Sequence, residues 1–327
     1  MGIKTSQKIL KYISEKGQTS GKELADFLND IGERAVRKQL KNLLDSGQLL
    51  KIGKPPKVFY FIPNSKDPLD KSTIVDTKTK KVINERYLYI TPSGDELSGW
   101  TGFVAWCLRT KQEPVKTAHE YISTLKKYDI YLSKGLINGM KKMRQTFDTV
   151  YLDELYYIDF YSIERFGKTK LGQMLLYAKQ SQNRQLMKKL IDELRPKVIS
   201  LIVDKKIDGI MFIPPTVIRS VQFMKELEKQ MNITTKSLRI TKIKTPISVP
   251  QKTLNKLEDR VLNAQKTFAI EDSGMYKNIL LIDDAVGSGS TLNEVAQKIR
   301  NKGMCTGKII GLAITGSFKG FDVISEV

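Results

Sequence analysis

The feature that most constrains the fold is an alternation of short apolar runs with helix-like segments over residues 158–327. The runs IDGIMFIP, LRITKI, KNILLIDD and KIIGLAIT have the length and β-branched content of buried strands. Segments such as QNRQLMKKLIDELRPKVISLIV, VIRSVQFMKELEKQM and TLNEVAQKIRNKG repeat apolar residues at helical spacing, whereas residues 244–272 read as a charged segment. The alternation predicts an α/β domain with a doubly wound, mostly parallel sheet, which binds ligands at the carboxyl ends of its strands.

Two adjacent carboxylates, Asp283 and Asp284, end the run KNILLIDD. We expect a loop over residues 285–290 and then a helix that begins near Thr291. A glycine-containing loop at a helix N-terminus offers free backbone N–H groups and suits a phosphate. The predicted phosphate-binding residues provide backbone access or hydroxyl groups, and they are Gly287, Ser288, Gly289, Ser290 and Thr291.

Carboxylates that pointed at a bound phosphate would repel it. Asp283 and Asp284 make chemical sense if they hold something neutral or cationic that is attached to the phosphate, such as sugar hydroxyls or Mg²⁺. A phosphate, a vicinal diol and a metal ion together describe a phosphoribosyl group.

The stretch ILLIDDAVGSGSTL resembles the signature of the type I phosphoribosyltransferases, which is an apolar strand, two acidic residues and a Thr/Gly-rich loop. The preceding stretch VPQKTLNKLEDRVLNAQKTFAI resembles the ComF-like branch of that family. Gly287 and Ser288 stand where the family commonly has two threonines, and the zinc finger usual in the branch is absent. The resemblance covers about residues 155–327, which we interpret as a phosphoribosyltransferase-like domain.

The resemblance implies that this domain binds phosphoribosyl pyrophosphate (PRPP), or a related nucleotide, together with Mg²⁺. Asp283 and Asp284 would then serve as the catalytic and metal-binding pair, and residues 287–291 would bind the terminal phosphate. In such a reaction pyrophosphate leaves through an oxocarbenium-like state while a nitrogen nucleophile attacks the anomeric carbon. The expected pyrophosphate-binding cations are Arg219, Lys252, Lys256 and Arg260.

Residues 1–63 have a different pattern, namely three amphipathic segments followed by two short β runs around a turn at residues 53–57. Ser20 and Glu23 have capping-box spacing at the start of the second segment. The apolar residues expected in the core of this unit are Ile9, Leu10, Ile13, Leu24, Phe27, Leu28, Val36, Leu40, Leu43 and Leu44.

This order of elements resembles the winged helix-turn-helix family, in which the third helix enters a DNA groove. Residues 4–63 carry 12 Lys and Arg against 6 Asp and Glu. A dimerisation or protein-docking role is the alternative to nucleic-acid binding. The residues expected to meet bases and phosphates are Arg34, Arg37, Lys38 and Lys41 on the helix, with Lys54 and Lys57 on the wing.

The region between these two domains is less informative. Residues 64–84 are polar and lysine-rich and are expected to form a linker, whereas residues 85–154 are expected to form a helical connector. Trp100, Phe103, Trp106 and Leu108 are interpreted as one packed helical face. The connector carries no chemical motif and is a candidate surface for a protein partner or for homo-oligomer formation.

The amino-acid composition limits which binding partners and which cellular compartment we expect. The net charge of +20 favours polyanions such as DNA, a DNA–RNA hybrid or nucleotides, although a merely lysine-rich surface is the alternative. Cys107 and Cys305 lack partners at metal-ligand spacing, so we expect a reducing cytoplasm and no zinc site. The sequence contains no uncharged apolar stretch of about 18 residues that could span a membrane, so no membrane partner is expected.

Three functions remain open. The first is a nucleic-acid-bound enzyme that transfers a phosphoribosyl group or cleaves a ribosyl bond. The second is a non-catalytic transcriptional regulator that senses PRPP, because the domain pair is similar to the purine repressors of Gram-positive bacteria. The third is an effector of a bacterial anti-phage system, because the pair is also similar to proteins that accompany some retron reverse transcriptases.

Overall fold

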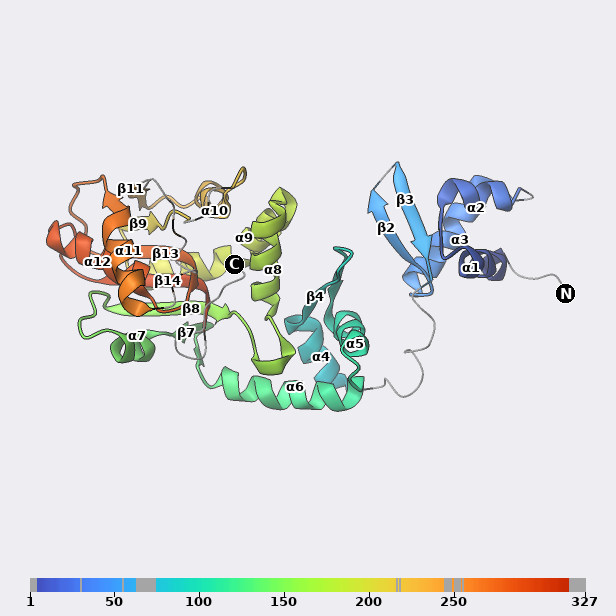
Figure 1. The fold of residues 1–327 in the computed structure, drawn as a ribbon, viewed down its shortest axis with the longest axis horizontal. Helices are drawn as coiled ribbons and strands as arrows, with labels where there is room; N and C mark the ends of the chain where they lie inside the picture. The colour runs from blue at the N-terminus through green and yellow to red at the C-terminus, as the bar shows by residue number, and fades with distance from the viewer. Residues whose placement is uncertain are drawn as a thin grey trace.

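A computed structural model describes residues 5–29, 31–54, 56–62, 75–215, 217, 219–243, 249, 254 and 256–317. Figure 1 shows a small N-terminal unit and a larger mixed α/β unit. The larger unit contains a seven-stranded, mostly parallel sheet with helices on both faces, so the expected α/β architecture is confirmed.

The N-terminal unit has its own hydrophobic core. Its elements are α1 (Thr5–Lys16), β1 (Gln18–Ser20), α2 (Gly21–Phe27), α3 (Glu33–Asp45), β2 (Leu50–Lys54) and β3 (Lys57–Phe61), and the strands pair antiparallel in the order β1-β3-β2. The Ser20 hydroxyl accepts the Glu23 N–H, and the Glu23 carboxylate accepts the Ser20 N–H, so the capping box is confirmed. The three helices and the hairpin therefore form as the sequence predicts.

One core prediction in this unit is wrong. Phe27 is 48% exposed, and its ring stacks on Tyr12 of α1 at 4.1 Å between ring centroids. Leu24 and Leu28 occupy the core instead. A residue at the last position of a seven-residue helix can turn toward the neighbouring helix, where an aromatic pair still buries part of its surface.

The large sheet has the strand order β10-β9-β13-β14-β8-β7-β6. The five strands from β10 to β8 are parallel, and β7 and β6 add to the edge antiparallel. Their bounds are β6 Leu132–Ser133, β7 Leu136–Asn138, β8 Glu154–Phe160, β9 Gly209–Phe212, β10 Lys236–Ser237, β13 Ile279–Val286 and β14 Ile309–Gly316.

Alternate residues of β13 enter two different hydrophobic clusters, because successive side chains of a strand point to opposite faces of the sheet. Leu280 and Ile282 pack with helices α8 (Lys170–Ser181), α9 (Arg184–Asp204) and α10 (Phe223–Met231). Ile279 and Leu281 pack in the cluster that holds α11 (Leu257–Thr267) and α12 (Ser290–Asn301). Burial on both faces explains why this strand reads as a continuous apolar run.

The predicted linker and connector are corrected by the structure. Helix α4 (Thr77–Arg86) begins within the expected linker, and a hairpin of β4 (Leu88–Ile90) and β5 (Glu96–Ser98) precedes α5 (Gly99–Arg109) and α6 (Pro114–Asp129). The stretch LSKGLIN, expected to be helical, turns at Gly135 (φ +77°) and forms the β6–β7 hairpin before α7 (Met140–Thr146). Pairing of β7 with β8 makes this region part of the α/β unit.

Three other local predictions differ from the structure. Leu108 is 42% exposed, whereas Trp100 and Phe103 are buried, so only part of the predicted aromatic face is packed. The helix expected from Val217 begins at Phe223. The charged segment 244–272 holds α11 and β12 (Phe268–Ile270), and β12 pairs with β11 (Ile240–Lys242).

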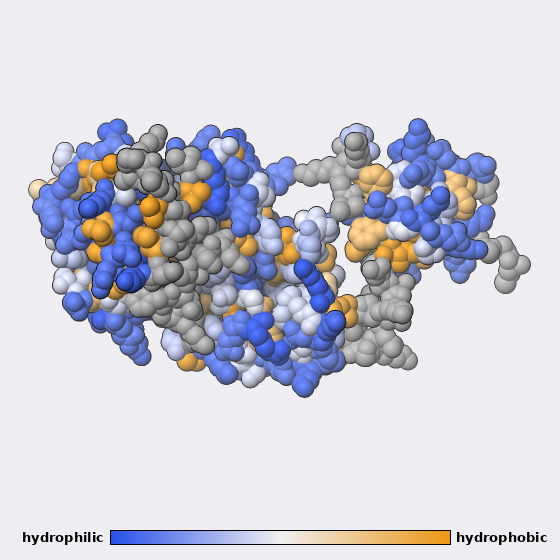
Figure 2. All heavy atoms as spheres, in the orientation of Figure 1, coloured by the Kyte–Doolittle hydropathy of each residue, from blue (hydrophilic) through white to orange (hydrophobic). Residues whose placement is uncertain are grey.

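Among the described residues, no helix is long and apolar enough to cross a membrane. The face of the molecule in Figure 2 is mostly hydrophilic, with hydrophobic residues in separate small groups. Exposed apolar residues scattered in this way are normal for a folded chain.

Candidate functional site

Strand β13 carries Asp283 and Asp284 to the carboxyl edge of the sheet, where Asp283 is in register with Ala313 of β14. The strand continues through Val286, and α12 begins at Ser290. The loop therefore consists of residues 287–289 and is shorter than the predicted loop of residues 285–290. A short loop holds the start of α12 close to the two carboxylates.

The chain reverses its direction of winding between β9 and β13. From β9 it moves outward to β10, and it then crosses back to β13 and on to β14. In an open α/β sheet, the point where the strand order reverses leaves a crevice at the carboxyl ends, and ligands bind there. The Asp283–Asp284 pair and the loop of residues 287–289 lie at that edge of β13.

Asp284 forms an ion pair that the sequence did not reveal. Its Oδ2 lies 2.6 Å from Nζ of Lys179 on α8, and the two side chains are 15% and 8% exposed. Lys179 is the charged member of an otherwise apolar helical stripe that includes Leu175 and Ala178. A lysine on an apolar stripe is a signal that a buried carboxylate lies nearby, but it does not say which one.

Asp283 has the opposite surroundings. Its Oδ1 accepts the backbone N–H of Asp284 at 2.8 Å. Burial raises the pKa of Asp283, and the neighbouring Asp284 carboxylate raises it further. Neighbouring residues of a strand point to opposite faces, so a ligand that used both carboxylates would lie across the end of β13.

The loop after the strand is buried and tightly built. Gly289 has φ +89°, a conformation that glycine adopts easily, and a Cβ at this position would overlap Sδ of Met143 on α7. The Ser288 hydroxyl donates to the Ser290 hydroxyl at 3.1 Å. Within the described part of the chain, no hydrogen bond from the backbone N–H groups of Gly287, Ser288 and Gly289 is found. Thr291 lies half-buried in the first turn of α12.

The cations predicted to bind pyrophosphate lie on separate segments of the chain. Arg219 is half-buried in the segment after β9, and Lys256 is exposed immediately before α11. Arg260 is 5% exposed, and its Nε donates to the carbonyl of Leu254 at 2.7 Å, so this guanidinium fastens α11 to the preceding chain. Lys252 lies outside the described residues.

A further carboxylate occupies the end of β8, two strands away from β13. Asp159 is in register with Thr315 of β14, and its Oδ1 accepts the Phe160 N–H at 2.8 Å. Burial raises the pKa of Asp159 to about 6. The Thr315 hydroxyl is buried and has no hydrogen-bond partner among the described residues. Sequence reasoning missed both residues, although an acid near the end of the apolar stretch ELYYIDF repeats the pattern of KNILLIDD.

In the part of the chain that the structure describes, no group of three or more His, Cys, Asp and Glu side chains gathers as a metal site. Lys179 pairs with Oδ2 of Asp284, and Asp283 is the other carboxylate of the pair. A Mg²⁺ ion held there would take most of its oxygen ligands from a bound phosphate compound and from water.

The basic residues predicted on the third helix share its exposed side. Arg34, Arg37, Lys38 and Lys41 are all exposed on α3, and the guanidinium of Arg37 lies 2.9 Å from the Glu33 carboxylate one turn earlier. Lys54 and Lys57 end β2 and begin β3 at the tip of the hairpin, and their side chains lie outside the described part of the structure.

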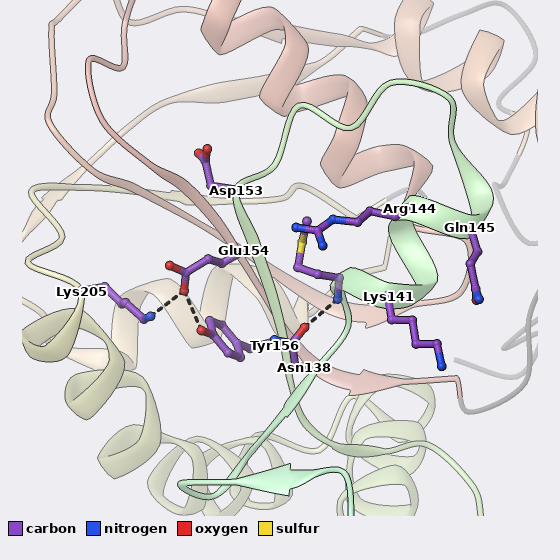
Figure 3. Close-up of a pocket in the computed structure, with 9 residues that line it drawn as sticks. Asn138, Lys141, Arg144, Gln145, Asp153, Glu154, Tyr156 and Lys205 are labelled. Carbon is purple, nitrogen blue, oxygen red and sulfur yellow. Dashed lines mark hydrogen bonds and ion pairs between the residues drawn. The ribbon is translucent and has the colours of Figure 1, made fainter.

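A cavity of about 600 Å³ opens at the other end of the sheet, where β8 begins. Figure 3 shows Glu154 between Lys205 and Tyr156, with Arg144 extending from α7 toward the same region. No residue predicted from the sequence as a site residue lines this cavity.

The chain matches no protein-family model and none of the curated proteins with which it was compared.

Proposed function

We propose that the α/β unit binds a phosphoribosyl compound, with PRPP as the reference ligand, at the carboxyl edge of β13. One observation carries the proposal: a strand buried on both faces carries Asp283 and Asp284 in its second half, and after Val286 a three-residue loop leads directly into α12. The type I phosphoribosyltransferase-like domain and its ComF-like relationship are part of this proposal.

The residues of the proposed PRPP site have different roles. The free N–H groups of residues 287–289 and the first turn of α12 bind the terminal phosphate, since both present partial positive charge. Asp283 accepts hydrogen bonds from the ribose hydroxyls, and it is the side chain that would hold Mg²⁺. When bound, Mg²⁺ supplies neutralisation of the pyrophosphate charge.

The environment of the two carboxylates bears on turnover. Lys179 neutralises Asp284, and Arg260 is engaged with the Leu254 carbonyl. A phosphoribosyl transfer or ribosyl-bond cleavage needs cations that stabilise the departing pyrophosphate. Transfer is the first candidate function, and these two engaged side chains favour a second candidate, in which PRPP is sensed without turnover.

We further propose that the N-terminal unit is a winged helix-turn-helix domain that binds DNA or a DNA–RNA hybrid. The support is the exposed cationic side of α3, on which Arg34, Lys38 and Lys41 are one or two turns apart. Such a helix contacts base edges and phosphates when it enters a major groove.

PRPP binding is tested by calorimetry in the presence of Mg²⁺. Asp283→Asn should weaken the affinity for PRPP by at least about tenfold, since it removes a charged acceptor of the ribose hydroxyls. Asp204→Asn is the matched control, because Asp204 is exposed at the end of α9 and carries the same charge. Unchanged PRPP affinity in Asp283→Asn would overturn the site.

Turnover separates the two candidate functions. The wild-type chain is incubated with PRPP, Mg²⁺ and a panel of bases and nucleotides, with and without DNA, and pyrophosphate release is measured. Release that Asp283→Asn abolishes identifies an enzyme. Binding without release, together with a DNA affinity that PRPP changes, identifies the sensor.

Nucleic-acid binding is tested by fluorescence anisotropy at several salt concentrations. Arg34→Ala with Lys38→Ala should weaken binding. It should also reduce the slope of log affinity against log salt concentration by roughly one unit for each lost phosphate contact. The control pair is Lys11→Ala with Lys16→Ala, which removes two exposed charges from α1 of the same unit. Equal losses in both pairs would indicate a general field effect and not a specific helix.

A further inference from the structure

The cavity at the start of β8 has the size of a small-molecule site and lies away from the proposed PRPP site. Its volume is about 600 Å³, within the usual range for ligand pockets. Glu154 begins β8, whereas residues 287–289 follow the end of the parallel strand β13. A seven-residue strand spans roughly 20 Å, so the cavity and the loop of residues 287–289 belong to opposite edges of the sheet.

The two carboxylates in the cavity wall are fully engaged. Glu154 lies 2.6 Å from Lys205 Nζ and 2.8 Å from Lys308 Nζ, and it accepts the Tyr156 hydroxyl at 2.6 Å. Burial alone would raise the pKa of Glu154, but the hydrogen bonds from Lys205, Lys308 and Tyr156 lower it to about 2. Asp153 pairs with Arg300 at 2.5 Å. Neither acid is free to attract a cation into the cavity.

Two other cations line the cavity without a carboxylate partner, and Figure 3 shows Arg144 extending toward Glu154 whereas Lys141 extends away from it. Lys141 and Arg144 are three residues apart on α7, and among the described residues neither forms an ion pair. The opposite side of α7 is held in place, because Met140 and Met143 are buried in the core. The cavity wall and its ion-pair partners thus contain five cations and two carboxylates, which leaves an excess of positive charge.

The donors suit a phosphate better than a simple anion such as chloride. The guanidinium of Arg144 extends toward Asp153 and Glu154 in Figure 3, and a guanidinium matches two phosphate oxygens with two parallel N–H groups. Gln145 lines the same wall from the next position of α7, and its exposed amide can donate to and accept from a base or a sugar.

We propose that this cavity binds the phosphate group of a nucleotide, with Arg144 and Lys141 as its principal cations. The nucleotide is either free or part of a nucleic-acid strand, and both sources present the same phosphate chemistry to α7. The site is independent of the PRPP site proposed above.

The test measures binding in the full-length chain that carries Asp283→Asn, so that the proposed PRPP site is disabled. The probes are AMP, measured by calorimetry, and a labelled short single-stranded oligodeoxynucleotide, measured by anisotropy. Lys141→Glu with Arg144→Glu should weaken binding at least about tenfold. Both residues are exposed, so the fold is retained and the thermal midpoint checks this.

The matched control is Lys126→Glu with Lys127→Glu, which makes the same change of charge on exposed residues of α6. Loss of AMP binding in the α7 variant alone supports a site for free nucleotides. Loss of oligonucleotide binding alone, again only in the α7 variant, supports a site for a nucleic-acid strand. Unchanged affinity for both probes, or equal loss in the α6 control, would overturn the proposal.

Discussion

Asp283 on β13 and Glu154 at the start of β8 belong to the same sheet and have opposite electrostatic surroundings. Glu154 receives two lysines and a tyrosine hydroxyl, and its pKa is lowered to about 2. Asp283 receives one backbone N–H and lies beside a second carboxylate, and burial raises its pKa. The fold therefore stabilises the charged form of one acid and destabilises the charged form of the other.

This difference separates a structural acid from a candidate binding acid. A group whose charged form is stabilised by folding contributes to stability, whereas a group whose charged form is destabilised reduces it. Perturbed acids of the second kind cluster at functional sites, because a ligand can supply the missing partners. Asp284 lies between the two cases, since Lys179 provides one strong partner on one face of the sheet.

The largest effect is expected when Lys179 is changed to Met. The substitution leaves the Asp284 carboxylate largely buried without its ion-pair partner. Removal of one member of a buried pair is strongly destabilising, so we expect a loss of about 3 kcal/mol in the free energy of unfolding. Urea denaturation measures it.

The control for this change is the double variant Lys179→Met with Asp284→Asn. It removes both charges, so it should recover more than half of the lost stability, and the double-mutant cycle gives the coupling between the two residues. A loss below about 1 kcal/mol in Lys179→Met would show that the pair is weak, as solvent-exposed pairs are. Asp284 would then have surroundings comparable to those of Asp283.

A smaller effect is expected at the other edge of the sheet, for Glu154→Gln. The variant loses two charge-assisted hydrogen bonds, but Lys205 and Lys308 can return to water. We therefore expect the free energy of unfolding to fall by about 1.5 kcal/mol. The contribution of Glu154 is present above its usual pKa of 4.5 and is lost as the pH falls toward 2. Urea denaturation between pH 2 and 6 should therefore show that the free energy of unfolding of the wild type rises with pH, and Glu154→Gln should lack this slope.

The matched control for this change is Glu258→Gln, an exposed acid in the first turn of α11. It should leave the slope unchanged. Equal slopes in the wild-type chain and Glu154→Gln would contradict the pairing that neutralises Glu154.

The sequence was most informative where structure depends on local signals. The capping box at Ser20 and the helix-spaced apolar residues of α3 lie within single elements, and the N-terminal unit was predicted nearly throughout. Strand β13 was predicted because it is buried on both faces. The strands β6 and β7 were not, since they are two and three residues long and depend on pairing with β8.

The candidate site was predicted in part for the same reason. The Asp283–Asp284 pair and the glycine loop are contiguous in the chain, so their chemistry can be read directly. Lys179 is 105 residues from Asp284, and only the packing of α8 on the sheet brings the two side chains together. The hydrogen bond from Arg260 Nε to the Leu254 carbonyl is likewise a product of folding, and it engages one N–H group of a predicted ligand cation.

The smallest effect is expected for Asp283→Asn, and its sign is opposite to the other two. The pKa of Asp283 is raised from its usual value of 3.8, so the folded state binds the proton more tightly than the unfolded state. The contribution of Asp283 to the free energy of unfolding is fully present below pH 3.8, and it is lost as the pH rises toward the folded-state pKa. Asparagine carries no such charge, so the variant should be more stable than the wild type at pH 8. Paired urea titrations at pH 4 and pH 8 measure the difference.

The gain should appear at pH 8 and vanish at pH 4, and it should accompany the weakened PRPP binding that marks Asp283 as a ligand residue. A variant that is less stable than the wild type at both values would place Asp283 with Glu154 among the structural acids and remove the contrast between the two edges of the sheet.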